Sequence, residues 1–178
     1  MSEVAQDAYT VTWLEMAERP SWPRPSLPGT VPTMLLAAEA PPVRWFLSLY
    51  EGVGAAYQWD DWQKRPAAEL EAFVSHPDVT IYTLMRQGWS AGFFMLDSRV
   101  DGVCDLAYFG LMPEAVGAGL GGWFLRTAIH TGWDRPGTRK LTVNTCTLDH
   151  PAALPLYQKC GFVPVRREDR LRSVTYDH

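Results

Sequence analysis

The chain of 178 residues has few cysteines, no dense basic segment and no long hydrophobic run. Its three cysteines, Cys104, Cys146 and Cys160, are odd in number and widely spaced, which argues against a disulfide framework and against a thiolate metal cluster. Sixteen basic against twenty acidic side chains leave a net charge of -4, so nucleic-acid binding lacks its electrostatic basis. Because no run of about 18 apolar residues occurs, we expect no membrane partner.

The opening MSEVAQDAYT is acidic and polar where a secretory signal needs a basic start and an apolar stretch. This pattern, together with the unpaired cysteines, predicts a soluble, cytoplasmic protein. The four histidines, at 76, 130, 150 and 178, show no metal-ligand spacing, so we also expect no metal. A hydrophobic fraction of 47% over 178 residues favours a single domain, residues 1–178, with a substantial core.

The order of predicted elements indicates an α/β fold. Residues 1–40 hold strand-like runs and a proline-rich connector that we expect to be an ordered surface loop. Apolar residues at helical spacing predict a helix over 42–57 and a second helix over 66–74, so residues 41–78 form a helical region.

From residue 79 onward the residue pattern is typical of β-strands. Three strands are predicted before residue 112, and Asp101 and Gly102 provide the turn of a hairpin. A glycine cluster, a helix over 120–133, a strand over 140–146 and a helix ending near Gly161 complete the segment 79–165, and a closing β segment spans 166–178. This order predicts one mixed sheet flanked by helices.

The glycine cluster lies between a buried strand and the start of a helix, in the run PEAVGAGLGGWFL. Unpaired backbone N–H groups and the positive end of the helix dipole bind anions there, and glycine allows close approach. A hinge without a ligand is the alternative. Although Gly117, Gly119 and Gly122 match GxGxxG, no acidic residue follows at the dinucleotide-binding distance, and no Lys-Ser or Lys-Thr completes a Walker pattern.

Two linked motifs resemble the GCN5-related N-acetyltransferases. The run from Val116 to Gly121 is similar to that family's pyrophosphate loop, Gln/Arg-x-x-Gly-x-Gly/Ala, and HPAALPLYQKCGF is similar to its Asn-x-x-Ala-x-x-x-Tyr helix followed by Gly-Phe. The resemblance covers residues 79–165 and implies a mostly antiparallel sheet whose splayed central strands hold acetyl-CoA. The cofactor-binding residues that it implies are Phe109, Leu111, Val116, Gly117, Ala118, Gly119, Leu120, Gly121, Gly122 and His150.

Two positions depart from the family pattern. Val116 stands where the family usually has Gln or Arg, and no Lys or Arg occurs from 101 to 125, so pyrophosphate binding would rest on backbone amides and the helix dipole. His150 occupies the usual Asn position, where it either donates a hydrogen bond, caps the helix or is an ordinary helix-start residue.

Acetyl transfer to an amine needs a base for the amine proton and an acid for the departing thiolate. Tyr157 shares a helical face with Ala153 and Cys160, so its ring should be buried, and we predict its hydroxyl to be the acid; a core tyrosine bonded to a carbonyl is the alternative. Asp105 is the only charged residue of its strand and falls where histone-type members carry their base glutamate. We predict it to be the base, with a solvated hairpin-end carboxylate, Tyr108 or a bound water as alternatives.

The acceptor side is predicted from the region in and after the first helix. Glu51, Trp59 and Asp60, with Tyr108 from the strand, are candidate substrate-binding residues, because carboxylates and ring faces attract an ammonium. A solvated loop with aromatic anchors is the other interpretation of this region.

The sequence therefore predicts an acetyl-CoA-dependent enzyme that acetylates a primary amine, small molecule or peptide, by direct attack. The alternatives are a non-catalytic acyl-CoA sensor on the same fold and an interaction domain with a decayed site. Exposed strand edges make a homodimer plausible.

Overall fold

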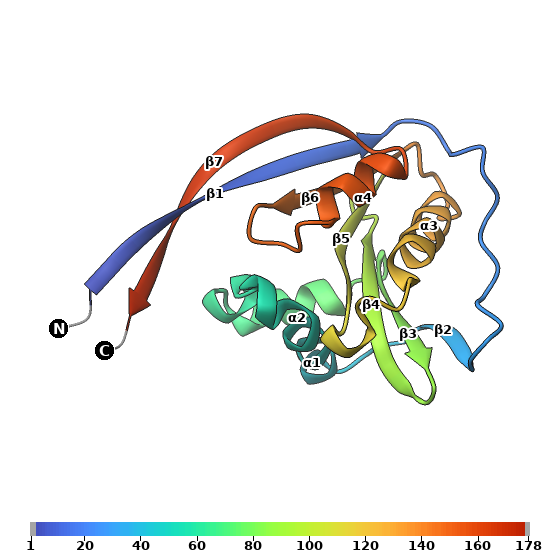
Figure 1. Cartoon of the computed structure of the whole chain (residues 1–178), viewed down its shortest axis with the longest axis horizontal. Coiled ribbons are helices and arrows are strands. Elements are labelled where there is room, and N and C mark those ends of the chain that lie inside the picture. The colour runs from blue at the N-terminus through green and yellow to red at the C-terminus, as the bar shows by residue number, and fades with distance from the viewer. Residues whose placement is uncertain (1–2, 177–178) are drawn as a thin grey trace.

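The computed structural model describes residues 3–176, which form one seven-stranded sheet with helices on both faces (Figure 1). The strands are β1 (Glu3–Met16), β2 (Thr33–Ala37), β3 (Val79–Arg86), β4 (Trp89–Asp97), β5 (Val103–Leu111), β6 (Lys140–Cys146) and β7 (Val163–Tyr176). The helices are α1 (Val43–Gly54), α2 (Ala67–Val74), α3 (Leu120–Trp133) and α4 (Ala153–Lys159). The predicted mixed α/β class is confirmed, while the first two and last two residues of the predicted domain lie outside the described part.

The strand order is β2-β3-β4-β5-β6-β1-β7. Among these described strands, β5 and β6 are the only parallel neighbours, which confirms a mostly antiparallel sheet. The hairpin turn at Asp101 and Gly102 forms as predicted, with Gly102 at φ +73°, a conformation that glycine adopts without strain.

The central strand β4 serves two hydrophobic cores because successive side chains point to opposite faces of a sheet. Phe94 and Leu96 belong to the cluster that includes α3 and α4 residues, whereas Phe93 and Met95 belong to the cluster formed with α1 and α2. All four side chains are at most 1% exposed. Burial on both faces explains why this strand reads as a continuous apolar run.

Two helix boundaries follow from proline. Pro42 directly precedes α1, and α4 begins at Ala153, so Pro155 falls in the first turn, where the missing N–H costs no helical hydrogen bond. The first helix is shorter than predicted, because residues Ala55–Tyr57 form a separate 3₁₀ turn ahead of another at Asp61–Lys64.

The central strands diverge beyond Asp105. Strand β6 pairs with β5 only at Val103, Cys104 and Asp105, opposite Lys140–Thr142, although β5 continues to Leu111 and β6 to Cys146. The predicted splay is therefore present, and it leaves a space between the two strands.

The first and last strands form a long ribbon that we call the arm, residues 3–16 of β1 with 163–176 of β7. Strand β1 pairs with β6 only through Val11–Met16 but pairs with β7 over nearly its whole length. Beyond the end of β6 the two strands continue as a ribbon that curves away from the body (Figure 1). The sequence predicted the closing segment to start at 166, whereas β7 starts at Val163, and the position of β1 between β6 and β7 was not predicted.

The connector between β1 and β2 is an ordered surface loop, as predicted. Arg19 and Arg24 each donate to Asp134 at the end of α3 over 2.6 Å, and the Trp22 ring packs edge-on against His130. These contacts fix the loop on the outer side of α3.

Candidate active site

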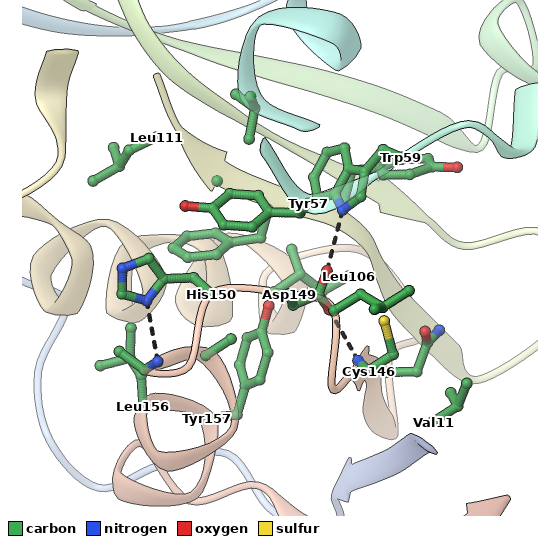
Figure 2. A pocket seen from close by; sticks show the side chains of 18 of the residues that line it. Val11, Tyr57, Trp59, Leu106, Leu111, Cys146, Asp149, His150, Leu156 and Tyr157 are labelled. Atoms are coloured by element: carbon green, nitrogen blue, oxygen red, sulfur yellow. Dashed lines mark hydrogen bonds between the residues drawn. The ribbon is translucent and has the colours of Figure 1, made fainter. Parts of the chain in front are cut away.

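A cavity of about 780 Å³ lies where β5 and β6 diverge. Its walls come from six places: residues 106–111 of β5, the glycine loop with the start of α3, the end of β6, the loop and helix from Leu148 to Tyr157, the end of α1 with the turns after it, and the arm. Figure 2 shows how side chains from these segments, among them Trp59, Asp149 and Tyr157, converge on one space. Segments from both ends of the chain thus meet in a single candidate site.

The glycine loop presents open backbone to this cavity. Gly117 and Gly119 have φ values of +84° and +74°, and no atom lies within 4 Å of a Cβ built on either residue. Positive φ explains why glycine occupies both positions, and the empty space leaves room for a ligand against the backbone. The loop leads into the N-terminus of α3, a helix of 14 residues whose dipole favours an anion there.

The structure brings together most of the residues predicted to bind the cofactor. Phe109, Leu111, Val116, Gly117, Gly119, Leu120, Gly121 and His150 line the cavity. Ala118 and Gly122 belong to the same loop and first helical turn but do not line it. The Nδ1 atom of His150 accepts the N–H of Ala152 over 3.1 Å, which stabilises the turn before α4; the N-cap residue of this helix is Ala152, without a side-chain cap.

Tyr157 is buried, with 6% of its surface exposed, and lines the cavity from α4. Its ring packs edge-on against Phe109 and Phe162 at centroid distances of 6.3 and 5.9 Å. Burial raises the pKa of the Tyr157 hydroxyl above its usual value, and the negative charges of Asp149 and Asp105 raise it further. The hydroxyl therefore stays protonated at neutral pH, which is the state that a proton donor needs.

Asp149 also lines the cavity, although it was not among the site residues predicted from the sequence. Its Oδ1 accepts the indole N–H of Trp59 over 3.2 Å, and its Oδ2 accepts the hydroxyl of Thr145 over 2.6 Å and the N–H of Cys146 over 2.9 Å. Figure 2 shows the Tyr157 hydroxyl pointing toward this side chain. Its place between β6 and the Ala-x-x-x-Tyr helix was the available sequence signal.

Asp105 lies at the point where the central strands part, and it faces a second cavity. This cavity of about 480 Å³ shares Ala107 and Tyr108 with the main one. The hydroxyl of Thr142 donates to Asp105 over 2.5 Å, but burial outweighs this bond and raises the pKa of the carboxyl to about 6. A carboxylate with a pKa near neutrality has the proton affinity of a useful base.

The structure places three of the four predicted acceptor residues at the main cavity and one away from it. Trp59, Asp60 and Tyr108 line the main cavity, whereas Glu51 is exposed on α1 and lines neither cavity. The Tyr108 hydroxyl accepts the indole N–H of Trp62 over 2.8 Å, and burial raises its pKa. Tyr108 therefore stays protonated and is poorly suited to act as a base.

The arm contributes site residues that no local sequence pattern indicated. Tyr9, Val11 and Trp13 from β1 line the main cavity beside Arg170 and Arg172 from β7. Neither terminal strand carries a family motif, so only the pairing of the two chain ends reveals this wall of the site.

The described part of the chain shows neither a membrane-spanning helix nor a cluster of metal ligands. Between residues 3 and 176, no helix combines the length and the apolar character that crossing a membrane requires. Within the same range, no group of three or more His, Cys, Asp or Glu side chains is placed to hold a metal ion.

Comparison with solved structures shows the fold. A functionally unknown conserved protein from Staphylococcus epidermidis aligns with a TM-score of 0.63 at 12% identity, covering 93% of this chain and 62% of that one. A putative acetyltransferase of the GNAT family from Novosphingobium aromaticivorans aligns with a TM-score of 0.59 at 16% identity, covering 94% and 65%. The chain thus spans less than two thirds of either neighbour.

An aminoglycoside acetyltransferase from an uncultured soil metagenomic sample aligns with a TM-score of 0.56 at 10% identity, covering 72% of this chain and 87% of that one. No curated protein matches significantly. The model of the acetyltransferase (GNAT) family matches residues 13–162, which include β6, the glycine loop and Tyr157. By this match, the chain belongs to the GNAT acetyltransferase family.

Proposed function

We propose that this protein transfers an acetyl group from acetyl-CoA to a primary amine by direct attack. The observation that carries the proposal is the convergence of the open glycine loop and the Tyr157 hydroxyl on the cavity between the splayed strands. Membership of the GNAT family supports acetyl transfer in general. A cytoplasmic location and a homodimer remain predictions.

The residues present fit acetyl-CoA. Its pyrophosphate is an anion, and the backbone of Gly117 to Gly121 is open to the cavity at the positive end of α3. Leu106, Phe109 and Leu111, in the part of β5 that pairs with β4 but not with β6, supply an apolar wall. Because no Lys or Arg occurs from 101 to 125, backbone amides carry the phosphate contacts.

In the reaction, the amine nitrogen attacks the thioester carbonyl carbon. A carbon–nitrogen bond forms, the carbon–sulfur bond breaks, the amine gives up a proton to a base, and the thiolate receives one from Tyr157. The raised pKa of the buried Tyr157 hydroxyl keeps its proton in place until the thiolate forms. The transfer needs no covalent enzyme intermediate.

Asp105 is the proposed base. Its pKa of about 6 keeps it ionised at neutral pH and close enough to neutrality to accept a proton. Because Asp105 lines the second cavity, which adjoins the main one at Ala107 and Tyr108, the proton reaches it through a bridging water.

The acceptor is proposed to be a small amine that enters between Trp59 and the arm. The mixture of ring faces and carboxylates there suits an ammonium. The similar fold of an aminoglycoside acetyltransferase supports a small-molecule acceptor rather than a macromolecular one.

Calorimetric titration with acetyl-CoA tests the proposal. Gly121 lines the cavity at ordinary φ, so Gly121→Glu adds bulk and negative charge without backbone strain and should abolish binding. Gly29→Glu is the matched control, since Gly29 has open space around it and lies in the exposed connector. If the wild type binds acetyl-CoA and releases the coenzyme thiol when an amine is added, the enzyme is supported. Binding of acetyl-CoA without turnover favours the sensor, and no binding refutes both.

A further inference from the structure

Arg172 lines the main cavity and is incompletely paired. Its Nε is buried without a hydrogen-bond partner in the described part of the chain, and its Nη2 reaches Asp60 only at 3.4 Å. Lys64 holds the same carboxylate over 2.6 Å. Asp60 therefore has a stronger partner, and the guanidinium of Arg172 can turn to an incoming anion without leaving a carboxylate uncompensated.

Asp149, which also lines the main cavity, is a carboxylate that lacks a cationic partner in the described part of the chain. Its three hydrogen-bond donors, from Trp59, Thr145 and Cys146, are all neutral, and no described cation lies within ion-pairing distance of it. A carboxylate has about four acceptor positions, two on each oxygen. Oδ2 accepts two bonds and Oδ1 one, so Oδ1 retains one position for a further donor.

We propose that the acceptor is an amine that also carries a carboxylate, with Asp149 holding the ammonium until it loses one proton to water and becomes the attacking amine, and with Arg172 holding the carboxylate. The inference rests on the proposed function and specifies its substrate class. One negatively and one positively charged residue of the cavity thus bind the two charged groups of one zwitterionic ligand, such as an amino acid.

The planar guanidinium suits a carboxylate, and phosphate is the other small-molecule anion that its geometry fits. Its Nε–H and one Nη–H are parallel donors that match the two oxygens of a carboxylate. The buried Nε of Arg172 is one of these two donors. The neighbouring Arg170 is engaged differently, since its Nε already donates to Glu168 over 2.9 Å. Arg172 is therefore the specificity-determining residue.

The experiment compares amines that differ only in the anionic group. Thiol release from acetyl-CoA is measured with β-alanine, 4-aminobutyrate and L-leucine, each beside its amide, and with phosphoethanolamine beside ethanolamine. We expect kcat/KM for the best carboxylate to exceed that for its amide by at least about tenfold, the size expected of a hydrogen bond between charged groups. Arg172→Gln should remove this preference through KM, and Asp149→Asn should lower kcat/KM for both members of a pair.

Arg166→Gln is the matched control, because Arg166 is an exposed arginine of the same strand that does not line the cavity. It should keep the preference. Equal kcat/KM for a carboxylate and its amide, or a preference that survives Arg172→Gln, overturns the proposal. A preference for phosphoethanolamine that depends on Arg172 keeps the anion site and assigns it to phosphate.

If no amine causes thiol release from acetyl-CoA, the same pairs are titrated calorimetrically in the presence of coenzyme A. This experiment separates the proposed binding site from the proposed acetyl transfer. Carboxylate-selective binding that is lost in Arg172→Gln supports the site while refuting the proposed acetyl transfer. Binding of neither member, or of both equally, refutes the site.

Discussion

The Asp105→Asn variant should become more stable than the wild type as the pH rises. In the folded protein the pKa of Asp105 is about 6, against a usual value of 3.8, because burial penalises the charged carboxylate. Between these two pH values the folded state keeps a proton that the unfolded chain loses. The contribution of this group to the free energy of unfolding is therefore complete below the unfolded-state pKa. It is lost as the pH rises through the folded-state pKa.

The size of the effect follows from the difference between the two pKa values. At 1.36 kcal/mol for each pH unit, the group costs the wild type at most about 3 kcal/mol above the folded-state pKa. Asparagine does not titrate, and its carbonyl oxygen can still accept the Thr142 hydroxyl. The gain of the variant over the wild type should thus grow from near zero at about pH 4 toward this limit at about pH 7.

Urea denaturation of both proteins at pH intervals between about 4 and 8 measures the gain, since other titrating groups cancel in the difference. Asp101→Asn is the control, because Asp101 is 92% exposed and its bond to Arg139 lowers its pKa, so no gain should appear. A gain for Asp105→Asn that is independent of pH would refute the raised pKa. In Asp105→Asn, but not in Asp101→Asn, the acid limb near pH 6 should be lost from the kcat/KM profile if Asp105 is the base.

Two other predictions concern the main cavity. Tyr157→Phe should lower kcat by about two orders of magnitude or more while leaving the calorimetric affinity for acetyl-CoA nearly unchanged, and an unchanged kcat would remove Tyr157 from the mechanism. Gly110→Ala should destabilise the fold by about 1–3 kcal/mol, because the new Cβ collides with Cγ1 of Val53. Adding Val53→Ala should make the Gly110 substitution cost less in a double-mutant cycle, measured by urea denaturation, and purely additive costs would contradict the collision.

Local sequence patterns predicted much of the fold because each pattern reports on a few neighbouring residues. The helix Leu120–Trp133 and the strand Lys140–Cys146 have the predicted bounds, since apolar spacing and flanking glycines act within one element. Gly110 of β5 faces Val53 of α1 in a close approach that glycine permits. The first helix was predicted too long, because the break at Gly54 depends on Trp59 packing where a Cβ would stand.

The sequence by itself determined the family, the glycine loop and Tyr157, because these reside in short motifs whose spacing is fixed by one loop and one helix. Tertiary structure decided the rest of the site. Asp149 gains its importance from a hydrogen bond with Trp59, 90 residues earlier in the chain. Arg172 reaches the cavity only because the first strand pairs between β6 and the last strand. Contacts between residues so far apart depend on how the whole sheet is assembled, and no local pattern encodes them.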